Sequence, residues 1–233
     1  MIHQDLLNLL RTTDSFAVIE KIQEVGSPQE IASEYQKLVS NLYWKARDLP
    51  AVITIGRAGI YYCLTQAMTA TSAEPMDQLR SVAKSLAYDI GSFTWPGWEE
   101  PGIDPTPADL AVGMECARLN LRLAIELNKP KDRLSMAHWL IGAHALSIAE
   151  LDLAEKQFQL AQEVLPIDDP AIKTLGPCNL GYLAIARLCK NGADQAAHAD
   201  LNQILAELAA RNSDDSRMYL SQLQSAHRIF VPG

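Results

Sequence analysis

The strongest fold signal in the chain runs from Trp139 to Pro166 and reads W-L-I-G-A-H-A-L-S-I-A-E-L-D-L-A-E-K-Q-F-Q-L-A-Q-E-V-L-P. Its apolar residues recur at three- and four-residue spacing, which indicates amphipathic helices. Small residues at Gly142, Ala154 and Ala161 let two helices approach closely, and the ring of Phe158 fills the space between them. The stretch therefore predicts a tightly packed helix pair.

The same pattern of alanine, bulky residue and alanine recurs elsewhere in the chain. The recurrences are Ala51, Ile55 and Ala58, then Ala117, Leu121 and Ala124, and more loosely Ala197, Leu201 and Ile204 after Leu180-Gly181. With Gly142 and Pro166 at the family's spacing, the pattern resembles the tetratricopeptide repeat (TPR). The signatures begin 66, 37 and 43 residues apart, against a family period of about 34, so the array is degenerate. The alternative is an amphipathic bundle with coincidental alanines.

Clear start and stop signals divide the chain into helices. Ser27-Pro28-Gln29-Glu30 combines an N-cap serine, a first-turn proline and a glutamate that can close a capping box. Similar signals predict eleven helices and no strand, at residues 2–10, 15–25, 28–47, 50–69, 75–90, 107–128, 131–149, 151–164, 170–190, 193–211 and 213–230. The resemblance implies an all-α, right-handed α-solenoid of antiparallel TPR-like helix pairs. We expect one continuous domain with N-terminal capping helices at 1–26, repeats at 27–211 and a C-terminal capping helix at 212–233.

An irregular insertion at 91–106 interrupts the repeats. Its core, residues 91–105, holds three prolines, three glycines and two of the four tryptophans, Trp95 and Trp98, so it cannot be helical throughout. A loop of this length is usually either functional or packed down by its own aromatic side chains. Two interpretations follow: the tryptophans plug a gap between helices, or the loop lines or covers a ligand groove.

The resemblance implies a groove lined by the first helix of each repeat. Its candidate residues are Gln36, Ser40, Tyr43, Trp44, Trp139, Ala143, Leu146 and Tyr182, with Trp95, Trp98 and Glu99 added from the insertion. An aromatic groove suits a peptide or a helix of another protein. We therefore expect a non-enzymatic scaffold that binds a protein or peptide partner. Family members often clamp a carboxylate between basic residues, for which this chain offers mainly Lys37 and Lys84.

The alternative function is an enzyme or small-molecule binder. Its composite pocket would use His138 with the loop residues Trp95, Trp98, Glu99, Glu100 and Asp104. His138 and His144 stand six residues apart on one helix and so cannot chelate one metal together. No nucleotide-binding or hydrolase motif occurs, and we expect neither a metal nor a cofactor.

Composition narrows the partners further. The net charge of -8 repels a polyphosphate backbone, which argues against nucleic acid. The N-terminal residues lack the pattern of a signal peptide, and no apolar run has the length of a membrane span. Four scattered cysteines without a CxxC pair are typical of reduced core residues. We expect a cytoplasmic protein without membrane contact, and self-association through an end helix is a further possibility.

Overall fold

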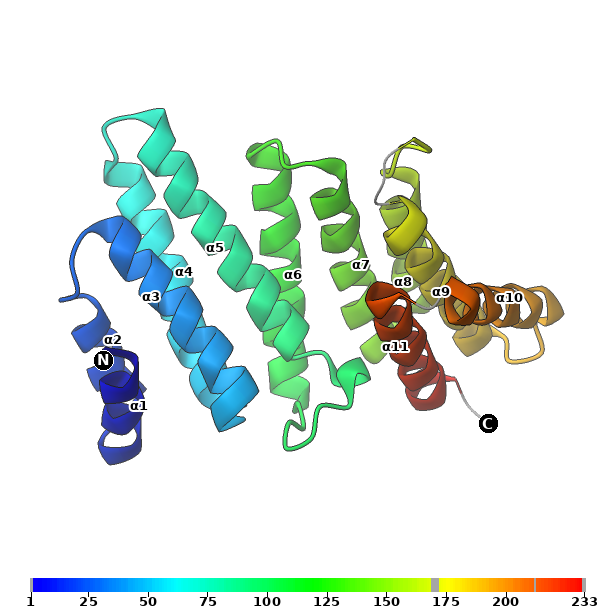
Figure 1. The fold of residues 1–233 in the computed structure, drawn as a ribbon, viewed down its shortest axis with the longest axis horizontal. Helices are drawn as coiled ribbons and strands as arrows, with labels where there is room; N and C mark the ends of the chain where they lie inside the picture. Colours follow the sequence, from blue (N-terminus) through cyan, green and yellow to red (C-terminus); the bar gives the residue numbers. More distant parts are fainter. Residues whose placement is uncertain (1, 169–171, 212, 232–233) are drawn as a thin grey trace. The chain divides into compact units, whose positions relative to one another are not determined.

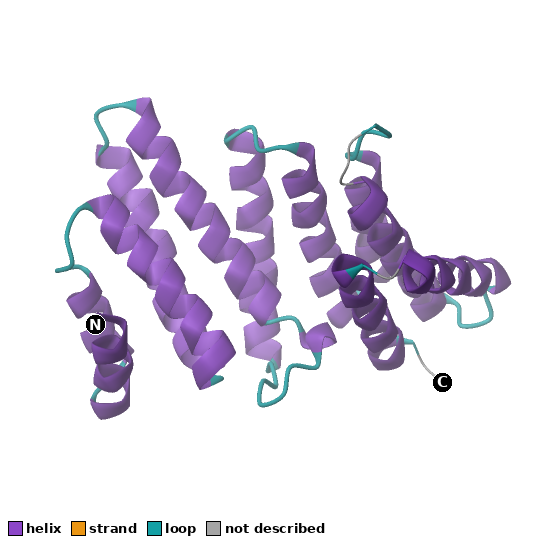
Figure 2. Cartoon of the chain, viewed as in Figure 1, coloured by secondary structure: helices purple, strands orange, loops and turns teal. Residues whose placement is uncertain are grey.

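The computed structural model describes residues 2–168, 172–211 and 213–231, and within them every regular element is helical (Figure 2). The chain forms two compact units, one of residues 1–94 and 107–127 and the other of residues 95–106 and 128–233. Consecutive helices pack against each other within each unit. The all-helical prediction is thus confirmed. The helix start predicted at Pro170 lies outside the described residues.

The first unit stacks its helices in chain order. The elements are α1 (Ile2–Thr12), α2 (Ser15–Ile22), α3 (Pro28–Asn41), the π-helical turn η1 (Leu42–Ala46), α4 (Leu49–Thr69), α5 (Ala73–Phe93) and α6 (Pro107–Glu126). Helix α3 packs on α4, α4 on α5 and α5 on α6 (Figure 1). The predicted capping box forms, because the side chains and backbone amides of Ser27 and Glu30 bond reciprocally.

Glycines bring three helices of this unit close together. A Cβ atom on Gly56 would lie 2.8 Å from the side chain of Ile90 in α5, and one on Gly59 would lie 2.8 Å from the ring of Tyr35 in α3. Helix α4 is therefore held between α3 and α5 at distances that no larger residue permits. The predicted signature beside them is partly right: Ala51 and Ile55 are buried, whereas Ala58 is half-buried.

The second unit contains the stretch from Trp139 to Pro166. Its elements are the short 3-10 turn η2 (Pro96–Trp98), α7 (Lys131–Ser147), α8 (Leu151–Glu163), α9 (Ile172–Lys190), α10 (Gln195–Arg211) and α11 (Asp214–Phe230). The ring of Phe158 in α8 lies against Gly142 in α7, where an added Cβ would be 2.7 Å from ring atom Cε1. Ala154, Phe158 and Ala161 are all fully buried. The close helix pair predicted from Trp139–Pro166 is confirmed.

Helix α9 packs against α10, as the repeat spacing suggested, and also against α11. Gly181 lies against Leu223 of α11, whose Cδ1 would be 2.6 Å from an added Cβ. Pro177 stands inside α9 and has no backbone N–H, so it cannot bond to the Lys173 carbonyl one turn earlier. Arg211, at the end of α10, donates to that carbonyl instead.

Several predicted boundaries are wrong by a few residues. The helix expected at 28–47 is divided, because the chain changes from α3 to the π-helical turn η1 and then turns at Arg47, which has a left-handed backbone with φ 56°. The insertion expected at 91–106 is shorter, because α5 continues through Phe93. No helix in the described ranges has the length and apolar character needed to cross a membrane.

Candidate binding sites

The insertion is packed into the second unit by its first tryptophan. Trp95 is 1% exposed, and its indole N–H donates to the backbone oxygen of Ala143 in α7 at 3.0 Å. Its ring folds over Gly97, where an added Cβ would lie 2.2 Å from ring carbons. Only glycine fits beneath the indole at this turn.

Five aromatic side chains surround this contact and form what we call the aromatic cluster: Trp95, Trp98, Trp139, Tyr182 and Phe230. The Trp95 ring lies 4.9 to 6.1 Å, centroid to centroid, from the other four. The contacts with Trp98, Trp139 and Tyr182 are edge-on, an arrangement that aromatic pairs favour. The cluster joins the insertion to α7, α9 and α11, so its tryptophans hold helices together.

An ion pair ties the second half of the insertion to α11. Glu99, which has a left-handed backbone with φ 47°, accepts a hydrogen bond from the Arg228 guanidinium. This bond holds the pKa of Glu99 below its usual range. His138 is engaged elsewhere, because its Nδ1 lies 2.9 Å from Oε1 of Gln157 in α8. Glu99 thus contacts α11 and His138 contacts α8. Neither contact joins Glu99 to His138.

The groove residues predicted in the second unit are therefore core residues. Trp139 is 7% exposed and Tyr182 is fully buried within the aromatic cluster, and Ala143 and Leu146 are buried as well. The indole N–H of Trp139 is buried without a hydrogen-bond partner among the described residues. These side chains offer almost no surface to a partner.

The candidates in the first unit lie on and before the π-helical turn. Tyr43 is buried and its ring stacks on Phe93 at 3.8 Å, whereas Trp44 is 53% exposed and meets both rings edge-on. The Arg47 guanidinium lies 5.9 Å from the Trp44 ring centroid. Gln36 and Ser40 are half-buried on α3. Trp44 is thus the predicted aromatic residue that remains accessible, and the π-helical turn that presents it had no recognisable sequence signal.

The two lysines considered for a carboxylate clamp differ in environment. Lys37 is exposed and bonds Glu34 on its own helix at 2.7 Å. Lys84 is 8% exposed and lies with Nζ 5.8 Å from the Tyr88 ring centroid. Burial raises the pKa of nearby Asp89 to about 6, although the Lys84 charge opposes that shift. Neither lysine therefore has the open position that a clamp requires.

The cysteines are not reactive. All four are free thiols, and burial raises the pKa of Cys63 to about 12 and those of Cys116 and Cys189 to about 11. The pKa of Cys178 rises further. A thiol becomes a nucleophile only as the thiolate, so these groups stay inert at neutral pH. Within the described ranges, no three His, Cys, Asp or Glu side chains are grouped as a metal site would need.

A half-open groove of about 420 Å³ lies between α8, α9 and α10, and we call it the α9 groove. Its apolar surface comes mainly from one side of α9, with Ile204 contributed by α10. The apolar lining consists of Ile172, Gly176, Pro177, Leu180, Leu183, Ala184 and Ile204. Leu180 is 40% exposed there, so a large side chain faces water. Such a surface is stabilised by an apolar ligand.

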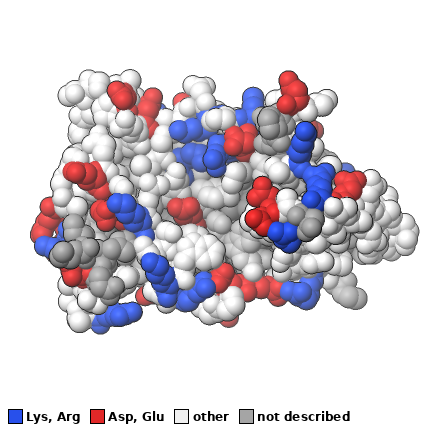
Figure 3. Space-filling model, in the orientation of Figure 1, with Lys and Arg blue, Asp and Glu red and all other residues white. Residues whose placement is uncertain are grey.

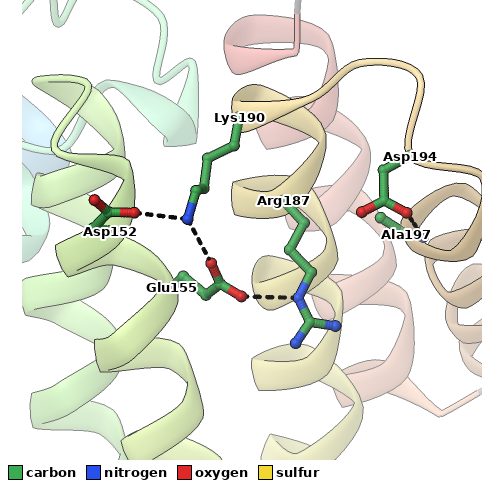
Figure 4. Close-up of polar contacts among 6 residues, drawn as sticks. All are labelled: Asp152, Glu155, Arg187, Lys190, Asp194 and Ala197. Carbon is green, nitrogen blue, oxygen red and sulfur yellow. Dashed lines mark hydrogen bonds and ion pairs between the residues drawn. The ribbon is translucent and has the colours of Figure 1, made fainter.

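Arg187, which lines the α9 groove, belongs to a group of ion pairs between α8 and α9 (Figure 4). Glu155 of α8 binds Arg187 at 3.0 Å and Lys190 at 3.0 Å, and Asp152 binds Lys190 at 2.6 Å. The hydrogen bond from Lys190 is the main reason why the pKa of Glu155 is lowered. The two acidic and two basic side chains of this group thus balance one another in charge.

The α9 groove was not foreseen from the sequence, although part of its signal was present. Asp200, Gln203, Ile204 and Glu207 recur at the spacing of one helical face, and all four line the groove. What could not be foreseen is that α10, although it packs against α9, would leave Leu180 partly exposed beside Ile204. No protein-family model, curated protein or solved structure matches the chain, so the case for a function rests on the geometry of its own residues.

Proposed function

We propose that this chain is a non-enzymatic helical-repeat scaffold, similar to TPR proteins, that binds a segment of another protein in the α9 groove. The observation that carries the proposal is the exposed apolar lining around Leu180, Leu183 and Ile204. A groove between helices, open on one side, suits an inserted peptide side chain or a short helix.

Contacts between helix ends support the antiparallel pairing of this proposal, in which the pairs form a right-handed array. Ser135 near the start of α7 donates to the Ala161 backbone oxygen near the end of α8, at 2.8 Å. Lys190 at the end of α9 binds Asp152 at the start of α8. Both bonds join the beginning of one helix to the end of the other, as antiparallel neighbours require.

The binding site in this proposal differs from the expected row of first helices. Trp139 and Tyr182 are taken up by the aromatic cluster, whereas α9 presents its other side in the groove. In this proposal the aromatic cluster holds the helices of the second unit together, and the α9 groove binds the partner.

The test is a selection of displayed random peptides against the wild-type protein, followed by binding measurements with the selected peptides. Leu180→Glu introduces a charge into the groove lining and should weaken binding about 100-fold, as loss of a central apolar contact does at protein interfaces. The matched control is Met218→Glu, because Met218 is similarly exposed on α11 and does not line the groove. Peptides that bind both variants equally well would contradict the proposal.

A further inference from the structure

The charge that remains unbalanced in the α9 groove is negative. Asp200 lines its α10 side, is exposed, and forms no ion pair with any residue in the described ranges. Glu207, two turns later on the same side, lies 3.9 Å from Arg211 and accepts a hydrogen bond from Gln203 at 3.0 Å. The Glu207 charge is therefore offset by Arg211, whereas the Asp200 charge is not.

The opposite side adds no net charge of its own. Arg187 also lines the groove, but Glu155 holds its Nε, and Lys190 is shared between Glu155 and Asp152 (Figure 4). These two bases and two acids cancel. The field that a bound segment meets is thus set by Asp200, within a chain of net charge -8.

A second polar group in the groove is an unpaired acceptor. Oε1 of Gln162 is buried and has no hydrogen-bond partner among the described residues. It lies 3.6 Å from the position of a Cβ on Gly176, beside the apolar lining. A buried acceptor without a donor carries a free-energy cost, but this oxygen has too little accessible surface to be offered to a ligand.

We propose that the occupant of the α9 groove is a cationic peptide segment, which seats an apolar side chain beside Leu180 and directs a Lys or Arg at Asp200. The inference rests on the proposed function and specifies its partner. An apolar residue matches the lining, and a cation matches the unbalanced carboxylate of Asp200. An acidic segment would bring like charge to the α10 side.

The same displayed library tests this inference separately from the proposed function. Selected peptides should combine a large apolar residue with Lys or Arg, and their affinity should fall as salt is raised. For one such peptide, made synthetically, Asp200→Lys should weaken binding about fivefold to tenfold, since a close charge pair is replaced by repulsion. Glu163→Lys is the matched control, because Glu163 is an exposed acid on α8 that does not line the groove.

A charge exchange completes the test. The same peptide with its basic residue changed to Glu should bind the Asp200→Lys variant better than it binds the wild type. Selected peptides that depend on Leu180 but are neutral or acidic overturn the cationic partner and leave the scaffold standing. Peptides that ignore Leu180, or a library that yields none, overturn both.

Discussion

The α7–α8 and α9–α10 helix pairs each begin with a helix that carries a buried glycine, yet they pack differently. In the first pair, Gly142 faces the second helix and receives the ring of Phe158. In the second pair, Gly181 faces α11 and receives Leu223. Gly181 of the second pair thus packs against α11, and although α9 also packs against α10, part of the surface between α9 and α10 opens into the groove.

The contrast between Gly142 and Gly181 indicates how a degenerate repeat can acquire a binding surface. A small residue followed by a matching large one closes a helix pair, because the interior tolerates neither a void nor a clash. When the small residue faces a third helix, as Gly181 does, the pair lacks that close contact although its two helices still pack, as α9 and α10 do. The resulting surface is an open groove and not a second copy of the core.

The largest expected effect is loss of the ring that closes the first pair. Phe158→Ala should destabilise the protein by about 3–5 kcal/mol, since a fully buried ring leaves a cavity. Leu180→Ala, the comparison in the groove, should cost no more than about 1 kcal/mol because Leu180 is 40% exposed. Urea unfolding of both variants measures this contrast, and equal costs would show that the two pairs do not differ.

Replacing glycine by alanine should have opposite effects on the free energy of unfolding in the two pairs. Gly142→Ala places a Cβ 2.7 Å from Phe158 and should cost about 1–3 kcal/mol. Gly176→Ala meets its nearest atom at 3.4 Å and should stabilise α9 by up to about 1 kcal/mol through helix propensity. Thermal unfolding gives both signs, and a destabilised Gly176→Ala variant would argue that the groove is filled.

The contact between Gly142 and Phe158 could be predicted from the sequence, whereas the contact between Gly181 and Leu223 could not. Gly142 and Phe158 belong to a local pattern, so their spacing alone places them opposite each other. Gly181 has the same local setting, but its partner Leu223 is 42 residues away and nothing in the spacing selects it.

The insertion shows the same limit. Its prolines and glycines predicted an irregular segment, and its tryptophans left two interpretations open. The bond from Trp95 to Ala143, 48 residues away, places the insertion in the core. Such a contact depends on how α7 and α11 are arranged, and no local pattern encodes it.

A moderate effect is expected at the ion pairs between α8 and α9. The pKa of Glu155 is lowered in the folded state, so its contribution is present above its usual pKa and is lost as pH falls through the lowered value. Glu155→Gln should destabilise the protein by about 1 kcal/mol at neutral pH and by little near pH 3. Urea unfolding at both pH values measures this. The exposed Glu163→Gln control should change stability at neither, and a pH-independent loss in Glu155→Gln would point to packing.

The smallest effect on stability is expected where the effect on binding is largest. Leu180→Glu should change the free energy of unfolding by about 0.5 kcal/mol or less, since the side chain is partly in water and both residues favour helix. Chemical unfolding checks this. A cost near that of Phe158→Ala would mean that Leu180 belongs to the core.

The surface charge of the protein is mixed. Basic and acidic side chains are interspersed on the face drawn in Figure 3. Recognition in the α9 groove is expected to depend on the carboxylate of Asp200, unpaired among the described residues, beside an apolar lining.

The aromatic cluster has a consequence for spectroscopy. Three of the four tryptophans, Trp95, Trp98 and Trp139, belong to it and so to the second unit, while Trp44 is exposed in the first. The Trp44→Phe variant would confine every indole to the second unit, and its intrinsic fluorescence would then follow that unit alone. The chain thus carries its own optical reporter for the part of the molecule that contains the groove.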